Sequence, residues 1–137
     1  MDDVDRQILD ALRRDARTPY TEIAEDIGVS EGTVRNRVDQ LVEDGVIERF
    51  TVATSTGNVK AMIEIGVAMD VDTNEVGDRM VEWDAVDHVW QVSGDEDIVL
   101  VVDAADTGGV NDLMTKAREQ DAVVSTRTRL ILDEQLG

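Results

Sequence analysis

The sequence lacks cysteine altogether and contains one histidine, one proline and only 3% aromatic residues. The absence of cysteine excludes disulfides, thiolate metal sites and cysteine nucleophiles. A lone histidine, His88, is too little for a zinc site, so we expect no bound metal. No apolar run approaches the roughly 18 residues of a membrane span, and the first residues are acidic where a secretory signal is basic. We therefore expect a cytoplasmic protein with no membrane partner.

Basic residues are also scarce. The chain contains 13 Lys and Arg residues and 31 Asp and Glu residues, which gives a formal net charge of −18 and a pI near 4.1. Taken directly, this charge excludes nucleic acid, because phosphate binders normally carry a basic excess. The alternative is adaptation to molar salt, where the Debye length falls to roughly 3 Å and repulsion from DNA is screened. The acids are scattered along the chain rather than gathered in one tail, and this favours a protein of an extreme halophile.

Residues 1–50 are expected to form a helical domain. Apolar residues recur at helical spacing from Val4 onwards, and this first helix should end near Thr18 and Pro19. A shorter second helix is expected over residues 21–27.

A glycine turn and a capped helix follow. Gly28 accepts a left-handed backbone at little cost, and Ser30 should cap a third helix that runs to about Asp44. This helix, turn and capped helix are the layout of a helix-turn-helix domain. Residues 46–54 are expected to form a short wing strand, so that residues 51–60 hold the end of the strand and a linker.

From Ala61 onwards the apolar period changes to two, which is typical of strands. The patterns predict strands over 61–71, 86–93, 98–103 and 123–132, and helices over 73–83 and 107–120. The order βαββαβ is that of a ferredoxin-like unit over residues 61–137. The expected fold class is therefore α+β, with a winged helix-turn-helix domain before a ferredoxin-like domain.

Residues 98–102 are apolar at every position, so both faces of this strand need burial. Both helices of a ferredoxin-like unit cover the same face of the sheet, and the other face would leave an apolar patch on a monomer. Pairing two sheets face to face covers that patch and predicts a homodimer.

The third helix carries a polar face of the kind that contacts DNA. On a helical wheel, Val34, Val38 and Leu41 form the buried stripe, whereas Thr33, Asn36, Arg37 and Gln40 lie together on another face. Arg is suited to guanine, and Asn or Gln to adenine. Arg35 lies on the flank, placed for a phosphate or for an ion pair with Asp39. The candidate DNA-contacting residues are Ser30, Thr33, Arg35, Asn36, Arg37 and Gln40; the alternative is an ordinary solvated helix face.

Short motifs follow one another along the whole chain. They are VDRQIL at 4–9, EIA at 22–24 leading to GVS at 28–30, TVRNRV at 33–38 before GVI at 45–47, VSGDED at 92–97 and STRT at 125–128. Together they resemble the Lrp/AsnC, or feast/famine, family of transcriptional regulators. The second half is similar to that family's effector-sensing RAM module. The resemblance spans nearly the whole chain, and the motifs stand in the family's order.

The resemblance implies a dimeric, in some members octameric, regulator that binds double-stranded promoter DNA and responds to an amino acid. It places the effector near Ser93, Gly94, Asp95, Asp97, Thr126 and Arg127. N–H groups around Gly94 can hold an α-carboxylate, while Asp95 or Asp97 can pair with an ammonium group. Alternatively, this segment is only a hairpin turn with glycine at a positive φ.

Two other function classes are open at this point. One is an amino-acid-sensing or protein-interaction module that does not bind DNA directly. The other, an enzyme, is disfavoured because the sequence offers no paired carboxylates, nucleophile–base arrangement or phosphate-cradling loop. Apart from the amino-acid effector, no cofactor is expected.

Overall fold

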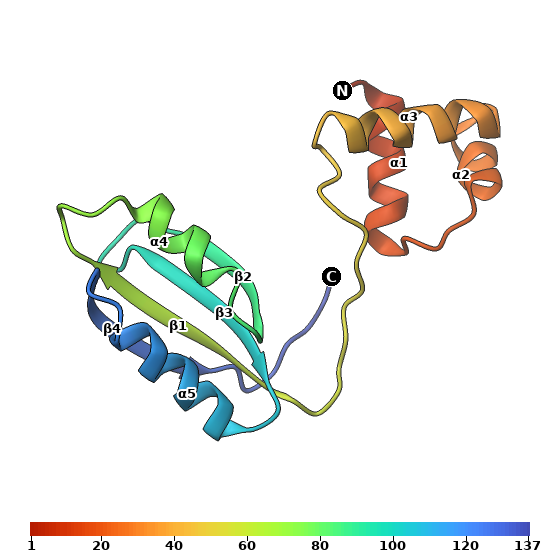
Figure 1. The fold of residues 1–137 in the computed structure, drawn as a ribbon. Helices are drawn as coiled ribbons and strands as arrows, with labels where there is room; N and C mark the ends of the chain where they lie inside the picture. The colour runs from red at the N-terminus through yellow and green to blue at the C-terminus, as the bar shows by residue number, and fades with distance from the viewer. The chain divides into compact units, whose positions relative to one another are not determined.

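The computed structural model describes all 137 residues, which form two compact units, residues 1–54 and 55–137. The first unit contains three helices, α1 (Asp3–Arg14), α2 (Tyr20–Ile27) and α3 (Glu31–Glu43) (Figure 1). They pack around a small apolar core that consists of Ile8, Leu12, Ile23, Ala24, Val34 and Val38. The three helices expected from the sequence are thus present. Each packs against this core through the apolar residues that its spacing indicates.

Helix α1 ends earlier than the apolar pattern indicates, at Arg14 rather than near Pro19. The reason lies in Asp15, whose Oδ1 accepts a hydrogen bond from the backbone N–H of Arg17 at 2.9 Å. The carbonyl of Asp15 also accepts hydrogen bonds from both the backbone N–H and the hydroxyl of Thr18. Short polar side chains compete with the helical ladder in this way, and here they close a turn that leads into α2.

The turn into α3 forms as the sequence predicts. Gly28 ends α2 with φ +85°, a left-handed conformation that glycine adopts without a steric penalty. Ser30 caps α3, because its Oγ accepts a hydrogen bond from the backbone N–H of Thr33 at 3.1 Å.

The expected wing strand over residues 46–54 is wrong. Those residues form no strand, and the first strand of the chain begins only at Val59. An extended segment becomes a strand only when its backbone pairs with a neighbour, and no strand of this chain pairs with it. Its apolar side chains Val46, Phe50 and Val52 are correspondingly exposed.

The second unit has the expected βαββαβ order, and the α+β class is confirmed. Its elements are β1 (Val59–Val67), α4 (Thr73–Met80), β2 (Val86–Gln91), β3 (Ile98–Ala104), α5 (Thr107–Arg118) and β4 (Val123–Leu130). The strands form one sheet in the order β2-β3-β1-β4, with every neighbouring pair antiparallel. Both helices lie on one face of this sheet (Figure 1).

Side chains along the two central strands, β1 and β3, point alternately to the face that the helices cover and to the opposite face. Ile63 of β1 and Leu100 of β3 are fully buried in the core beneath α4 and α5, which contribute Val76 and Val110. The side chains between these positions on β1 and β3 point away from both helices. We call that surface the open face of the sheet.

Strand β1 ends earlier than expected, at Val67 rather than at Val71. Its pairing with β4 is interrupted by a bulge between Gly66 and Val67, and the chain then turns away from the sheet. Met69, which the alternation placed inside, is consequently fully exposed. The other elements of this unit agree with their predicted positions to within a few residues at the ends.

Candidate DNA-reading helix and ligand-binding loop

The outer face of α3 is arranged as the wheel predicts. Val34, Val38 and Leu41 are buried, whereas Asn36 and Gln40 are exposed. The side chain of Asn36 makes no hydrogen bond to the rest of the chain, so both its amide groups are available to a ligand. The Nε2 of Gln40 donates to the Oδ1 of Asp44 at 2.8 Å, one turn further along. At the start of the helix, the hydroxyls of Ser30 and Thr33 lie 2.9 Å apart.

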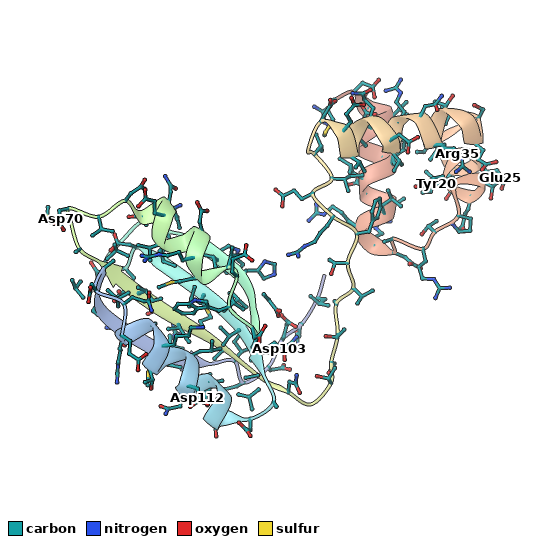
Figure 2. All side chains as sticks on the ribbon, viewed as in Figure 1. Tyr20, Glu25, Arg35, Asp70, Asp103 and Asp112 are labelled. Atoms are coloured by element: carbon teal, nitrogen blue, oxygen red, sulfur yellow. The ribbon has the colours of Figure 1, made fainter.

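Arg35 is already paired with an acid. Its Nη2 donates to the Oε1 of Glu31 at 2.6 Å, and its guanidinium lies 5.3 Å from the centre of the Tyr20 ring (Figure 2). Of the two roles predicted for Arg35, a phosphate contact or an ion pair with Asp39, the ion pair is wrong, because Glu31, four residues towards the N-terminus, is bound instead. Stacking on an aromatic ring further restrains the guanidinium at this flank.

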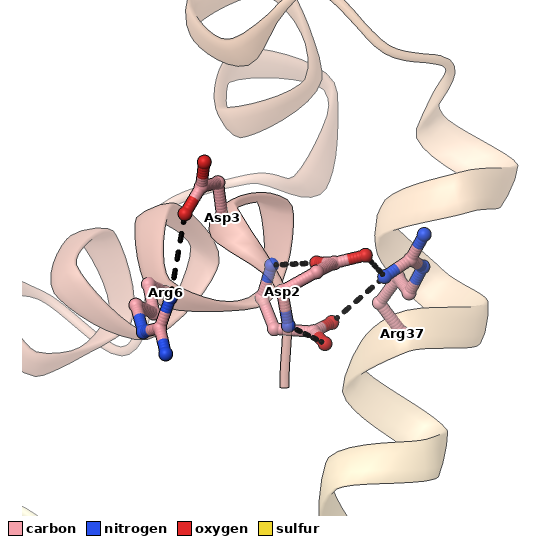
Figure 3. A network of polar contacts seen from close by, with 5 residues as sticks. Asp2, Asp3, Arg6 and Arg37 are labelled. Atoms are coloured by element: carbon pink, nitrogen blue, oxygen red, sulfur yellow. Dashed lines mark hydrogen bonds and ion pairs between the residues drawn. The ribbon is translucent and has the colours of Figure 1, made fainter.

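Arg37 is held by two acids from the start of α1. Its Nη1 lies 2.6 Å from the Oδ2 of Asp2 and 3.2 Å from the Oδ1 of Asp5 (Figure 3). The hydrogen bond from this guanidinium, together with one from the backbone of Asp5, lowers the pKa of Asp2 to about 2. The sequence places Arg37 on the reading face, and the structure places its charged end against α1.

Three arginines at and just after the end of α1 have no acidic partner, and none of them is among the predicted DNA-contacting residues. Arg13, Arg14 and Arg17 are exposed and form no ion pair within the chain. Arg13 and Arg14 occupy the last turn of α1, where the helix dipole favours positive charge. A charge count in short windows would have found them, because three basic residues within five positions are unusual in so acidic a chain.

The segment between β2 and β3 is tied to the end of β1 through Asp97. The Oδ2 of Asp97 accepts a hydrogen bond from the backbone N–H of Val67 at 2.7 Å, at the bulge. Its own backbone N–H donates to the carbonyl of Ile65, and its carbonyl accepts from the N–H of Val92. The carboxylate thus stabilises the end of β1, and only one of its oxygens is left for a ligand.

The neighbouring Glu96 links the same segment to β4. Its Oε2 accepts a hydrogen bond from the hydroxyl of Ser125 at 3.4 Å. The contact passes directly over Gly66, where a Cβ would collide with the Ser125 hydroxyl and would lie 3.4 Å from the Glu96 carboxylate. Neither Glu96 nor Ser125 was among the predicted ligand-binding residues, because a contact between positions 29 residues apart leaves no local pattern.

The remaining predicted effector residues do not all converge. Ser93 and Asp95 are exposed with no side-chain hydrogen bond in the chain, and Gly94 has φ +113° between them. On β4, the Oγ1 of Thr126 accepts from the Nε of Arg118 on the side of the sheet covered by α5. Adjacent residues of a strand point to opposite faces, so Arg127 lies on the open face and cannot share a ligand with Thr126 within one chain.

The open face of the sheet is apolar at its centre. Met62, Trp90, Val99 and Val101 occupy it on three adjacent strands. At its β4 side, the Glu64 carboxylate lies 3.9 Å from Arg127 and 3.7 Å from Arg129. His88 stacks on Trp90 at the β2 side, with ring centres 5.7 Å apart.

None of the five helices combines the length and the apolar character that a membrane span requires. Nowhere do three or more His, Asp or Glu side chains converge closely enough to hold a metal ion.

Comparison with known proteins covers both units. Residues 1–42 match the AsnC-type helix-turn-helix domain, and residues 60–135 match the Lrp/AsnC ligand binding domain. The transcriptional regulator LysM of Sulfurisphaera tokodaii is 33% identical over 133 residues, which are 96% of this chain and 95% of LysM.

Solved structures agree over the full length. AsnC of E. coli is 27% identical, with a TM-score of 0.77 over 100% of this chain and 95% of AsnC. A feast or famine regulatory protein from M. tuberculosis, complexed with L-methionine, is 26% identical, with a TM-score of 0.85 over 99% of this chain and 95% of that protein. These relatives are regulators rather than enzymes. With both of its units matched in the same order, the chain belongs to the Lrp/AsnC family of DNA-binding transcriptional regulators.

Proposed function

We propose that this regulator reads promoter DNA through Thr33, Asn36 and Gln40 on the exposed face of α3. The observation that carries this proposal is the free amide of Asn36 at the middle of a capped helix whose opposite side is buried. Amide side chains can donate and accept at adenine in the major groove. The unpaired arginines Arg13 and Arg17 would supply phosphate contacts that hold the domain on the duplex.

The second unit is proposed to bind an amino acid at the segment Ser93–Asp97. The exposed N–H groups around Gly94 suit an α-carboxylate, and Asp95 has no partner in the chain and suits an ammonium group. The relative from M. tuberculosis that was solved with L-methionine supports this chemical class of ligand.

A homodimer is proposed to form through the open face of the sheet. Its apolar centre around Val101, together with the half-exposed Trp90, is a surface that a monomer would leave in water. A second copy of the same face offers a complementary apolar surface, and the Glu64–Arg127 and Glu64–Arg129 pairs would lie at its rim. The net charge of −18 further supports a protein that works in concentrated salt, as expected of a halophile.

Selection of duplexes from a random-sequence pool by the full-length protein in molar KCl tests the DNA-reading proposal. Asn36→Ala should weaken binding to the selected duplex by about 1–3 kcal/mol and leave binding to random duplex nearly unchanged. Asn111→Ala is the matched control, because Asn111 is an exposed asparagine on α5 of the other unit. Equal affinities of the two variants for the selected duplex would contradict the proposal.

A further inference from the structure

The contact between Arg37 and the start of α1 has a geometry that goes beyond an ordinary surface ion pair. Asp2 and Asp5 form a capping box, in which the Oδ1 of Asp2 accepts from the N–H of Asp5 and the Oδ2 of Asp5 accepts from the N–H of Asp2. Each carboxylate therefore has one oxygen left. Both of these remaining oxygens contact the same Nη1 of Arg37, as Figure 3 shows.

The surroundings strengthen this arrangement. The side chain of Asp5 is only 13% exposed and that of Arg37 is 37% exposed, so water competes less for the contact than at a fully exposed pair. Isolated surface ion pairs contribute little, but a network whose members are already fixed by other hydrogen bonds loses less side-chain entropy on forming. The helix cap and the ion pairs thus hold one another in place.

This geometry is unfavourable for a base-reading arginine. Bidentate recognition of guanine uses two N–H donors of the guanidinium, and one terminal nitrogen of Arg37 is already bound to two carboxylates. Two carboxylates around one guanidinium also leave a net negative charge, which opposes the approach of a phosphate. Because Arg35 is paired with Glu31, neither arginine of α3 is left without an acidic partner.

We propose that Arg37 is a positioning residue, which Asp2 and Asp5 use to fix α3 against the start of α1 while withholding its guanidinium from DNA. The inference rests on the proposed function, since it concerns how the same helix meets the duplex. Its consequence is selectivity: a free arginine on the reading helix would strengthen binding to every sequence alike, whereas a bound one leaves discrimination to Asn36 and its neighbours.

The decisive variant is Asp2→Asn, with Asp3→Asn as its matched control. Asparagine caps helices as well as aspartate does, so Asp2→Asn keeps the cap but presents its NH2 group, instead of an oxygen, to Arg37. Asp3→Asn removes the same charge one residue away, where the carboxylate pairs with Arg6 instead (Figure 3). The measurement is binding to the wild-type-selected duplex and to a random-sequence duplex of equal length, across a series of KCl concentrations.

Asp2→Asn should strengthen binding to the random duplex more than Asp3→Asn does, and it should lower the ratio of selected to random affinity. Its slope of log affinity against log salt should become more negative by about one, because only the more distant Asp5 carboxylate, at 3.2 Å, still holds the guanidinium, which can then turn to a phosphate. A purely structural contact would not change this slope. Identical slopes for Asp2→Asn and Asp3→Asn would overturn the inference.

Arg37→Gln provides an independent readout on single-base variants of the selected duplex. It should change affinity by a similar factor for all of them, whereas Asn36→Ala should lose discrimination at one base pair. Loss of discrimination at one base pair by Arg37→Gln would make it a base reader and overturn the inference while leaving the proposed function intact. Failure of the wild type to enrich any duplex would instead contradict the proposed function. Thermal melting checks the fold of Arg37→Gln, and Asp2→Asn decides alone if that variant unfolds.

Discussion

The two oxygens of the Asp2 carboxylate serve two different helices, one closing the cap of α1 and one binding Arg37 of α3. Both contacts favour the ionised form, and this is why the pKa of Asp2 falls to about 2, below its usual value of 3.8. A carboxyl with a lowered pKa in the folded state stabilises that state fully at pH values above its unfolded pKa. The contribution is lost as the pH falls from about 4 towards 2.

Acid titration of stability therefore tests the contact without DNA. The melting temperature of the wild type should exceed that of Asp2→Asn by a constant amount above about pH 4, and the difference should shrink as the pH approaches 2. Thermal unfolding followed by circular dichroism, at one KCl concentration, measures both proteins. A difference that persists unchanged to pH 2 would show that the ionised carboxylate is not its source.

Gly94 is the residue on which the proposed ligand segment depends most. With φ +113° it occupies a region that residues with side chains rarely adopt, although a Cβ there would meet open space. Gly94→Val should thus act through backbone strain, on the order of 1–2 kcal/mol, and not through a collision. We expect it to abolish any amino-acid response while the first unit still binds DNA.

Gly57→Val is the control for general strain, because Gly57 also has a positive φ with open space around it but lies before β1. Thermal shift with each of the twenty amino acids, followed by DNA binding with the one that responds, measures the effect. A response that survives in Gly94→Val would mean that the segment is only a turn.

At the scale of elements, the two faces of β3 contact different surroundings: one lies beneath the helices and the other belongs to the open face. Leu100 is fully buried beneath the helices, whereas the half-buried Val101 lies on the open face. Leu100→Asp should therefore unfold the second unit, because it places an unpaired charge in the core. Val101→Asp should leave the unit folded and yield monomers. Sedimentation in molar KCl together with circular dichroism distinguishes the two outcomes, and a monomeric wild type would refute the dimer.

Apart from the end of α1 at Asp15, the elements that depend on local signals were predictable, and those that depend on distant partners were not. The cap at Ser30, the turn at Gly28 and the apolar stripe of α3 are each determined by residues that lie close together in the sequence. The segment 46–54 has a strand-like composition but no neighbouring strand to pair with, so composition alone was misleading.

The same division holds for the sites. The outward position of Asn36 follows from helical geometry, and the separation of Thr126 from Arg127 follows from strand alternation. The partners of Arg37 were not predictable, because Asp2 lies 35 residues away and only the packing of α1 on α3 brings the two together. Asp97 was predicted as a ligand by its chemistry, whereas its bond to Val67 arises from the bulge in β1.

For the whole molecule, charge is the dominant feature. Residues 1–50 carry 7 basic and 13 acidic residues, so even the DNA-binding unit is acidic. At low salt it should be repelled by DNA and destabilised by its own charge. At molar salt, Arg–phosphate contacts weaken while the global repulsion is screened, so two opposing effects determine the affinity.

We predict that folding requires molar KCl and that DNA affinity falls much less steeply with salt than for a basic regulator, or even rises. Binding and thermal unfolding from about 0.5 to 3 M KCl, a range that brackets the ~3 Å screening length, provide the measurement. A neutral osmolyte at matched osmolality is the control, because it changes water activity without screening charge. Full stability in dilute buffer with an ordinary steep loss of affinity would exclude salt adaptation.

The crowding at Gly66 also has an evolutionary consequence. A side chain at position 66 and the hydroxyl of Ser125 compete for one space, so any larger residue forces the serine to rotate and give up its bond to Glu96. Substitutions at positions 66 and 125, which are 59 residues apart in the chain, should therefore be coupled. Among homologues that keep this sheet, glycine at the first position should accompany serine at the second, and alanine at the first should accompany a residue without a γ atom, glycine or alanine, at the second.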